Sequence, residues 1–135
     1  NISKKALALG MKVIVSDIPS TPLGMRDSGV EVVSFDDLLA RSDFISTMVP
    51  LNKHTTGLIN AAAFDKMKPS VYIINTARGP IIDQDALVDA LRKKKIAGAA
   101  LDVFGAGSAP PPALPEDSDL YAVFNEFPNV ILTPH

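Results

Sequence analysis

The sequence has 135 residues, enough for one domain, and its 47% hydrophobic and 21% charged residues are typical of a globular protein with an apolar core. A net charge of −2 provides no strong attraction to nucleic acid or anionic membranes, and no apolar stretch approaches the ~20 residues of a membrane helix. The absence of cysteine excludes disulfides, zinc–thiolate sites and thiol catalysis. It also fits a reducing compartment, and we expect a cytoplasmic location.

Both ends of the sequence suggest that it is part of a longer protein. It begins with Asn1 rather than methionine, and it ends at Thr133-Pro134-His135, directly after an apolar segment. We therefore expect a fragment.

Short apolar segments alternate with longer amphipathic ones, the pattern of repeated strand–helix units. Helices are predicted at residues 2–9, from residue 36 onward, at 60–67 and at 83–95. Strands are predicted at residues 12–16, 30–33, 44–49, 71–75, 98–103 and 130–132. Strands that are apolar on both faces favour a parallel sheet with helices on each side, so we predict a doubly wound α/β fold.

Two segments have a distinctive composition. The lysines at 93–95 follow the predicted helix 83–95, and we interpret them as its solvated end rather than as a nucleic-acid site. Residues 105–115 (GAGSAPPPALP) form a low-complexity segment whose three consecutive prolines favour an extended chain.

The first possible functional residue is Asp17, at the end of the predicted strand 12–16. In a dinucleotide-binding unit, a carboxylate at this place accepts hydrogen bonds from a ribose and repels a 2′-phosphate. The residues Asn1-Ile2-Ser3 would then be the last of the preceding glycine-rich turn, at a helix N-terminus that faces the pyrophosphate. The alternative is that Asp17 merely forms a turn.

The second is Arg78, in the segment NTARG that follows the apolar strand 71–75. Ligands of open α/β sheets bind at the carboxyl ends of strands, where an arginine can hold a carboxylate through two charge-assisted hydrogen bonds. The alternative is a structural ion pair with Asp83 or Asp85.

The third is His135, which follows the last apolar segment. Histidine serves as a general acid–base near neutral pH, although a terminal histidine can also be incidental. His54 lies in the polar segment 52–56, and we expect it at the surface.

Four stretches together resemble the nucleotide-binding domain of the D-isomer-specific 2-hydroxyacid dehydrogenases. They are SDFISTMVPLNKHTTGLIN, FDKMKPSVYIINTARGPIIDQDALVDAL, KIAGAALDVF and FPNVILTPH, and they match in order and spacing. The resemblance implies a partial dinucleotide-binding domain at 1–135 with a Rossmann-like sheet, from which the first strand, the glycine-rich turn and the substrate-binding domain are absent.

The resemblance also assigns roles to individual residues. It implies that Arg78 binds substrate and that His135 is the catalytic histidine. It implies cofactor contacts by Asn1, Ile2, Asp17, Val49, Pro50, Thr76, Ala77, Arg78 and Asp102. Within this set, Asp17 matches the ribose-binding acid, which implies NAD rather than NADP. Val49 and Pro50 match the strand end beside the nicotinamide, and Asp102 matches the acid near the nicotinamide amide.

Two positions depart from the family pattern. Ser3 stands where the third glycine of the turn is usual, which puts the close packing of helix on strand in question. Gly107 stands where a glutamate usually follows the strand acid and hydrogen-bonds the catalytic histidine. Without that glutamate, we expect weaker proton delivery by His135, unless the loop folds back and Glu116 replaces it.

The function implied by the resemblance is hydride transfer between NAD(H) and a small 2-hydroxy or 2-oxo acid. A homodimer of the full-length protein is also implied. The fragment alone should be inactive, because it lacks the first strand and the substrate-binding domain. The alternative, favoured by Gly107, is a catalytically impaired dehydrogenase-like protein that binds NAD(H) and acts as a sensor or scaffold.

Overall fold

The computed structural model describes residues 2–17, 29–105 and 119–135. Its strands are β1 (Ile14–Val15), β2 (Glu31–Val32), β3 (Phe44–Thr47), β4 (Tyr72–Asn75), β5 (Gly98–Leu101) and β6 (Val130–Leu132). Its helices are α1 (Ile2–Ala8), α2 (Phe35–Arg41), α3 (Ala61–Phe64), α4 (Gln84–Arg92) and α5 (Asp119–Asn125), with a 3-10 turn η2 (Gly79–Ile81). The predicted α/β class is confirmed, whereas α5 was not predicted.

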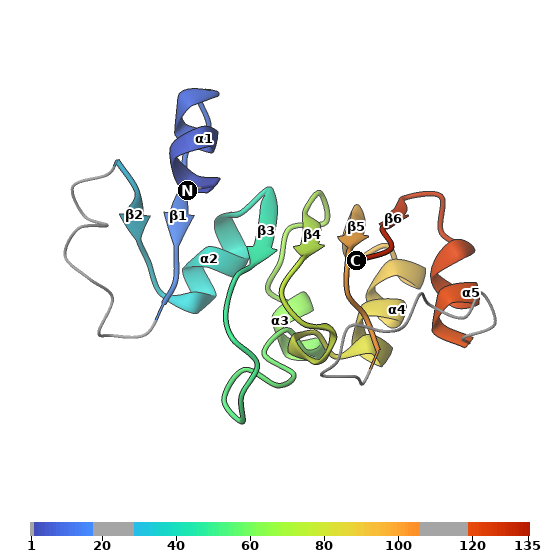
Figure 1. The fold of residues 1–135 in the computed structure, drawn as a ribbon. Helices are drawn as coiled ribbons and strands as arrows, with labels where there is room; N and C mark the ends of the chain where they lie inside the picture. Colours follow the sequence, from blue (N-terminus) through green and yellow to red (C-terminus); the bar gives the residue numbers. More distant parts are fainter. Residues whose placement is uncertain (1, 18–28, 106–118) are drawn as a thin grey trace.

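The described strands form two parallel groups (Figure 1). One is a four-stranded sheet in the order β3-β4-β5-β6, and the other is the pair β1-β2. Starting from β1, the next strand β2 is added in one direction along the sheet. Starting from β3, the next strands β4, β5 and β6 are added in the opposite direction. Among the described strands none hydrogen-bonds to both β1 and β3, which agrees with an incomplete doubly wound sheet.

A polar side chain just before the first helical residue explains where three of the helices begin. Ser34 accepts a hydrogen bond from the backbone N–H of Asp37 at the start of α2. Asn60 and Asp83 cap α3 and α4 in the same way. Each cap satisfies a backbone donor that the first helical turn leaves without a partner. The predicted helix 83–95 therefore begins as expected, but it ends at Arg92, before the lysines.

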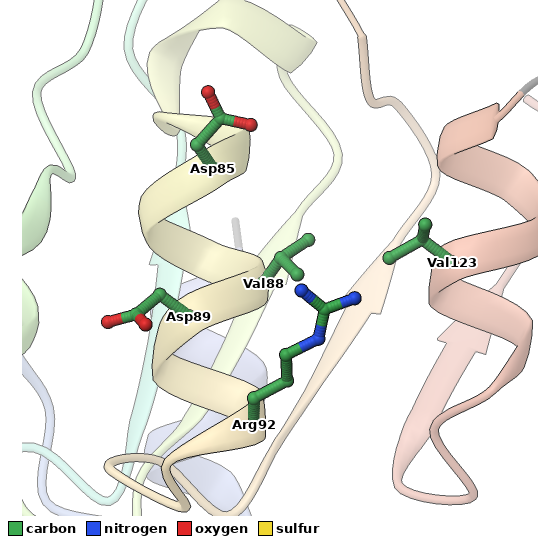
Figure 2. A pocket seen from close by; sticks show the side chains of 5 residues that line it. All are labelled: Asp85, Val88, Asp89, Arg92 and Val123. Atoms are coloured by element: carbon green, nitrogen blue, oxygen red, sulfur yellow. The ribbon is translucent and has the colours of Figure 1, made fainter.

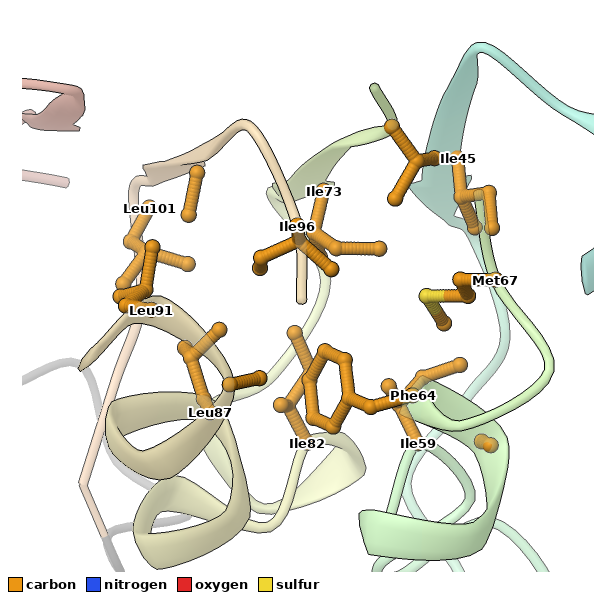
Figure 3. Packing of buried hydrophobic residues seen from close by; sticks show 14 of the residues in the cluster. Ile45, Ile59, Phe64, Met67, Ile73, Ile82, Leu87, Leu91, Ile96 and Leu101 are labelled. Atoms are coloured by element: carbon orange, nitrogen blue, oxygen red, sulfur yellow. The ribbon is translucent and has the colours of Figure 1, made fainter. Parts of the chain in front are cut away.

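The core lies on one face of the four-stranded sheet (Figure 3). Ile45 and Ile73 point to this face from neighbouring strands, and Phe64 of α3 and Leu87 of α4 pack in the same cluster. All four are at most 5% exposed. Helix α3 packs beside α2 and α4, while α5 packs against β6. Burial of the apolar side chains in this cluster stabilises the sheet against the helices.

The opposite face of the sheet differs from the expectation of helices on both sides. Phe44, Tyr72 and Ile131 are 55%, 42% and 64% exposed, and the rings of Phe44 and Tyr72 stack with centroids 5.7 Å apart. The strands are thus apolar on both faces, as predicted, but in the described part of the chain only one face is covered.

The two sheet groups should differ in local stability. A two-stranded ribbon is marginal by itself, whereas β4 and β5 each have partners on both sides and a buried face. We expect the β1–β2 amides of Glu31 and Val33 to exchange with deuterium at least about tenfold faster than those within β4 and β5 in the 135-residue chain.

Hydrogen–deuterium exchange followed by NMR measures this difference. Equal protection of β1 and β4 in the 135-residue chain would contradict the expectation.

Candidate functional site

The residues singled out in the sequence follow the carboxyl ends of parallel strands. We call the edge where β3, β4, β5 and β6 end the carboxyl edge. Val49 and Pro50 follow β3, and Arg78 follows β4 within the turn 76–78. Asp102 comes directly after β5, and His135 lies three residues after β6. Because the four strands are parallel and in register, these segments reach the same edge.

A buried asparagine holds the turn after β4. Asn75 is 1% exposed, and its Oδ1 accepts hydrogen bonds from Thr47 Oγ1 (2.7 Å) and from the backbone N–H of Ala77 (3.1 Å). Its Nδ2 donates to the carbonyl of Arg78 at 3.0 Å. One side chain therefore fixes both ends of the segment that carries Ala77 and Arg78. Thr47 and Asn75 are polar residues within the mostly apolar strands predicted at 44–49 and 71–75, and this was the sequence signal for their contact. The role of Asn75 in holding the turn was not predicted.

The side chain of Arg78 is exposed and donates from Nη1 to the carbonyl of Ala77 at 2.7 Å. Among the ion pairs of the described residues, none joins Arg78 to Asp83 or Asp85. Asp83 caps α4 instead. The structural alternative from the sequence is therefore not seen, and the guanidinium remains available for an anionic ligand at the carboxyl edge.

A close approach of two loops lies beside Arg78. A Cβ atom on Gly79 would lie 2.6 Å from the carbonyl oxygen of Gly105 and 2.8 Å from the carbonyl carbon of Phe104. Only a glycine at position 79 lets the chain after β5 pack this closely on the turn after β4. The loop that leads toward position 107 thus begins against the Arg78 turn.

Asp102, Thr133 and His135 form a hydrogen-bonded cluster at the ends of β5 and β6. Oδ2 of Asp102 lies 2.8 Å from Nδ1 of His135, and Oδ1 accepts a hydrogen bond from the hydroxyl of Thr133. These two hydrogen bonds, that of Thr133 first, hold the pKa of Asp102 below its usual range. The carboxylate is therefore ionised at neutral pH, directly beside the imidazole.

The remaining predicted residues lie elsewhere in the fold. Asp17 is exposed two residues beyond β1, and Ile2 is the first residue of α1 and 55% exposed. Thr76 is exposed in the turn after β4, and His54 is exposed in its loop, as predicted. Asn1, Gly107 and Glu116 lie outside the described residues.

The arrangement fits a dinucleotide. The direction in which strands are added reverses between β1 and β3, and ligands of doubly wound sheets bind at such a reversal. Asp17 follows the strand end on one side of the reversal, and Arg78, Asp102 and His135 follow strand ends on the other side.

A separate cleft lies between α4 and α5 (Figure 2). It is lined by Asp85, Val88, Asp89, Arg92 and Val123. None of the residues predicted to bind cofactor or substrate lines it, so it is not part of the carboxyl edge site. Within the described residues no group of three or more His, Asp or Glu could hold a metal ion, and no helix is long and apolar enough to span a membrane.

Comparison with known proteins agrees with this geometry. Residues 1–135 match the family described as "D-isomer specific 2-hydroxyacid dehydrogenase, NAD binding domain". The chain is 42% identical over 134 residues to D-3-phosphoglycerate dehydrogenase of Mycobacterium leprae, covering 99% of this chain and 24% of that protein.

Solved structures show the same likeness. The chain is 38% identical to a D-lactate dehydrogenase from Sporolactobacillus, with a TM-score of 0.87 over 99% of this chain and 41% of that one. It is 36% identical to D-lactate dehydrogenase from Aquifex aeolicus complexed with NAD and lactic acid, with a TM-score of 0.84 over 99% of this chain and 42% of that one. The chain thus spans less than half the length of each of these proteins.

The contacts of Asn75 lead to a stability prediction. Replacing Asn75 with Leu leaves the Ala77 N–H and the Arg78 carbonyl without their side-chain partner, and it leaves the Thr47 hydroxyl with only the longer contact to the Ile74 carbonyl. This loss should lower the free energy of unfolding by about 2–4 kcal/mol. The exposed neighbour substitution Thr76→Ala should cost less than about 0.5 kcal/mol. Urea unfolding measures both, and equal losses would show that Asn75 does not hold the turn.

Proposed function

We propose that this chain, which belongs to the NAD-binding domain family of D-isomer-specific 2-hydroxyacid dehydrogenases, is the cofactor-binding part of an oxidoreductase. The proposed reaction is reversible hydride transfer between NAD(H) and a small 2-hydroxy or 2-oxo acid. The observation that carries the proposal is the presence of a cation, Arg78, and an acid–base group, His135, at the carboxyl edge of one parallel sheet.

Arg78 is suited to recognise the substrate carboxylate. Its guanidinium is exposed and has no acidic partner among the described residues, so binding an anion breaks no existing ion pair. Two parallel N–H donors match the two oxygens of a carboxylate. The same group can also polarise an adjacent carbonyl, and the Asn75 contacts hold the backbone that carries it.

His135 is suited to transfer the proton. In reduction of a 2-oxo acid, the hydride forms the new C–H bond at the second carbon, and His135 gives its proton to the carbonyl oxygen. In oxidation, His135 accepts the hydroxyl proton as the hydride leaves. When bound, NAD supplies the hydride chemistry, and the protein supplies binding, orientation and the proton.

Residues that follow β1, β3, β4 and β5 are proposed to hold the cofactor. Asp17 accepts hydrogen bonds from the ribose, and its negative charge disfavours the 2′-phosphate of NADP. The backbone around Thr76 and Ala77 borders the nicotinamide side, at the turn that Asn75 anchors. Val49, Pro50 and Asp102 line the same side at the ends of β3 and β5.

The rest of the proposed protein lies outside this chain. Because the chain spans 24% to 42% of the relatives described above, we propose a separate substrate-binding domain and a homodimer formed through the cofactor domain. The side chain of the preferred 2-oxo acid is then selected largely by that other domain.

A substitution of Arg78 tests substrate recognition. In the full-length protein, Arg78→Gln should lower kcat/KM for 2-oxo acid reduction on the order of 10²-fold, mainly through KM, because it removes charge-assisted hydrogen bonds to the carboxylate. The measurement is NADH absorbance with glyoxylate, hydroxypyruvate and pyruvate. Arg92→Gln, in the cleft between α4 and α5, is the matched control and should keep wild-type rates.

The wild-type result separates the two functions. Turnover of any of these acids supports the dehydrogenase. NADH binding without turnover of any of them would instead support the catalytically impaired sensor or scaffold that Gly107 suggests.

A substitution of Asp17 tests cofactor choice. Asp17→Ser removes the carboxylate that binds the ribose and repels a 2′-phosphate, so the preference for NADH over NADPH should fall roughly 10–100-fold. Dissociation constants from cofactor fluorescence measure this preference. The control is Asp36→Asn, which removes an exposed acid of α2 that pairs with Lys66 and is not among the residues proposed to bind the cofactor. An unchanged preference in the Asp17 variant would remove Asp17 from the cofactor site.

A further inference from the structure

The sequence leaves open which carboxylate supports His135, because Gly107 has no side chain to offer and Glu116 lies outside the described residues. The structure describes one carboxylate in contact with this imidazole. Asp102 Oδ2 lies 2.8 Å from Nδ1 of His135, a normal distance for a charge-assisted hydrogen bond.

Backbone pairing fixes the relative position of the two residues. The N–H of Asp102 donates to the carbonyl of Asn75 at 3.0 Å, which extends the β4–β5 pairing by one bond. The N–H of Thr133 donates to the carbonyl of Leu101 at 3.1 Å, which does the same for β5–β6. The sheet thus fixes Asp102 directly, and it fixes the chain two residues before His135.

Two contacts also fix the rotation of the Asp102 carboxylate about its side-chain bonds. The Thr133 hydroxyl donates to Oδ1 while the imidazole contacts Oδ2, so both oxygens of Asp102 have partners. The imidazole and the carboxylate are each about 30% exposed, at 31% and 29%. A ligand at the carboxyl edge can therefore still reach the ring.

The chemistry of this contact determines the proton positions. An ionised carboxylate only accepts hydrogen bonds, so Nδ1 of His135 must carry a hydrogen. The neutral ring is then the Nδ1–H tautomer, and Nε2 is the atom that exchanges a proton with a ligand.

Other charged groups do not compete for this carboxylate in the described structure. The described side chains that contact the Asp102 carboxylate are those of His135 and Thr133. Arg78, on the neighbouring turn after β4, directs Nη1 to the Ala77 carbonyl.

We propose that Asp102 is the positioning residue for His135: it orients the ring and holds the Nδ1–H tautomer, so that Nε2 is the atom that exchanges a proton with a ligand. The inference rests on the proposed function for its kinetic consequence, but the tautomer and the contact are independent of any activity. It assigns to Asp102 a role beyond a contact with the cofactor.

Kinetics of the full-length protein provide the first test. Asp102→Asn should lower kcat for 2-oxo acid reduction on the order of 10²-fold with a smaller change in KM, because the loss falls on proton transfer. Glu116→Gln is the matched control and should keep the wild-type kcat.

NMR of the imidazole nitrogens provides the second test, and it needs no turnover. In neutral His135 the ¹⁵N shifts should show Nδ1 protonated in the wild type and a shift toward the Nε2–H tautomer in Asp102→Asn. The exposed His54 is the internal reference, and a His135→Gln variant assigns the signals.

The outcomes separate the two proposals. Wild-type protein that reduces no 2-oxo acid but shows the Nδ1–H tautomer overturns the proposed function and leaves the Asp102 contact standing. Active wild-type protein in which Asp102→Asn changes neither the tautomer nor kcat overturns the positioning role. Loss of activity in Glu116→Gln with an unaltered Asp102→Asn variant assigns that role to Glu116.

Discussion

Parallel pairing of β3, β4, β5 and β6 is the constraint on which the site depends. Arg78 and His135 are 57 residues apart in the sequence, yet both follow strands that end at the carboxyl edge. The pairing continues past the strands, through the backbone N–H groups of Asp102 and Thr133. Slippage of β6 by one residue would reverse the faces of its side chains and separate His135 from Asp102.

In this site, hydrogen-bonded residues at the strand ends support side chains that are exposed to ligands. Asn75 is buried and hydrogen-bonded at both ends of the turn it supports, whereas Arg78 on that turn is exposed. Asp102 is similarly held by the Thr133 hydroxyl and by the hydrogen bond from its own backbone N–H to the Asn75 carbonyl of β4, and it contacts the partly exposed ring of His135. This division lets the sheet determine positions while the side chains remain accessible to ligands.

Much of the fold could be predicted from the sequence, because apolar β-branched segments such as 71–75 and capping residues such as Asp83 mark where strands and helices begin. The predicted strands at 12–16 and 98–103 are longer than β1 and β5, since backbone pairing stops before the apolar pattern does. Helix α5 was missed because it follows the proline-rich segment.

The contacts of the site were less predictable than its location. The position of a strand end can be read from hydrophobic patterning, which placed Arg78 and His135 after strands that end at the carboxyl edge. Asp102 lay inside the predicted strand 98–103, and only the family resemblance singled it out. Which side chains touch depends on register between strands distant in sequence, so the contact of Asp102 with His135 was not foreseen. The exposed face of Phe44, Tyr72 and Ile131 was also unpredictable, because apolar patterning does not show what covers it.

The most direct measurement of the central claim is a crystal structure of the full-length protein with NAD and a 2-oxo acid analogue such as oxamate. The account predicts a nicotinamide at the carboxyl edge, with the analogue's carboxylate on Arg78, its carbonyl oxygen toward Nε2 of His135, and the adenosine ribose on Asp17. A nicotinamide bound elsewhere would contradict it, and so would a complex in which Arg78 and His135 cannot both contact the analogue.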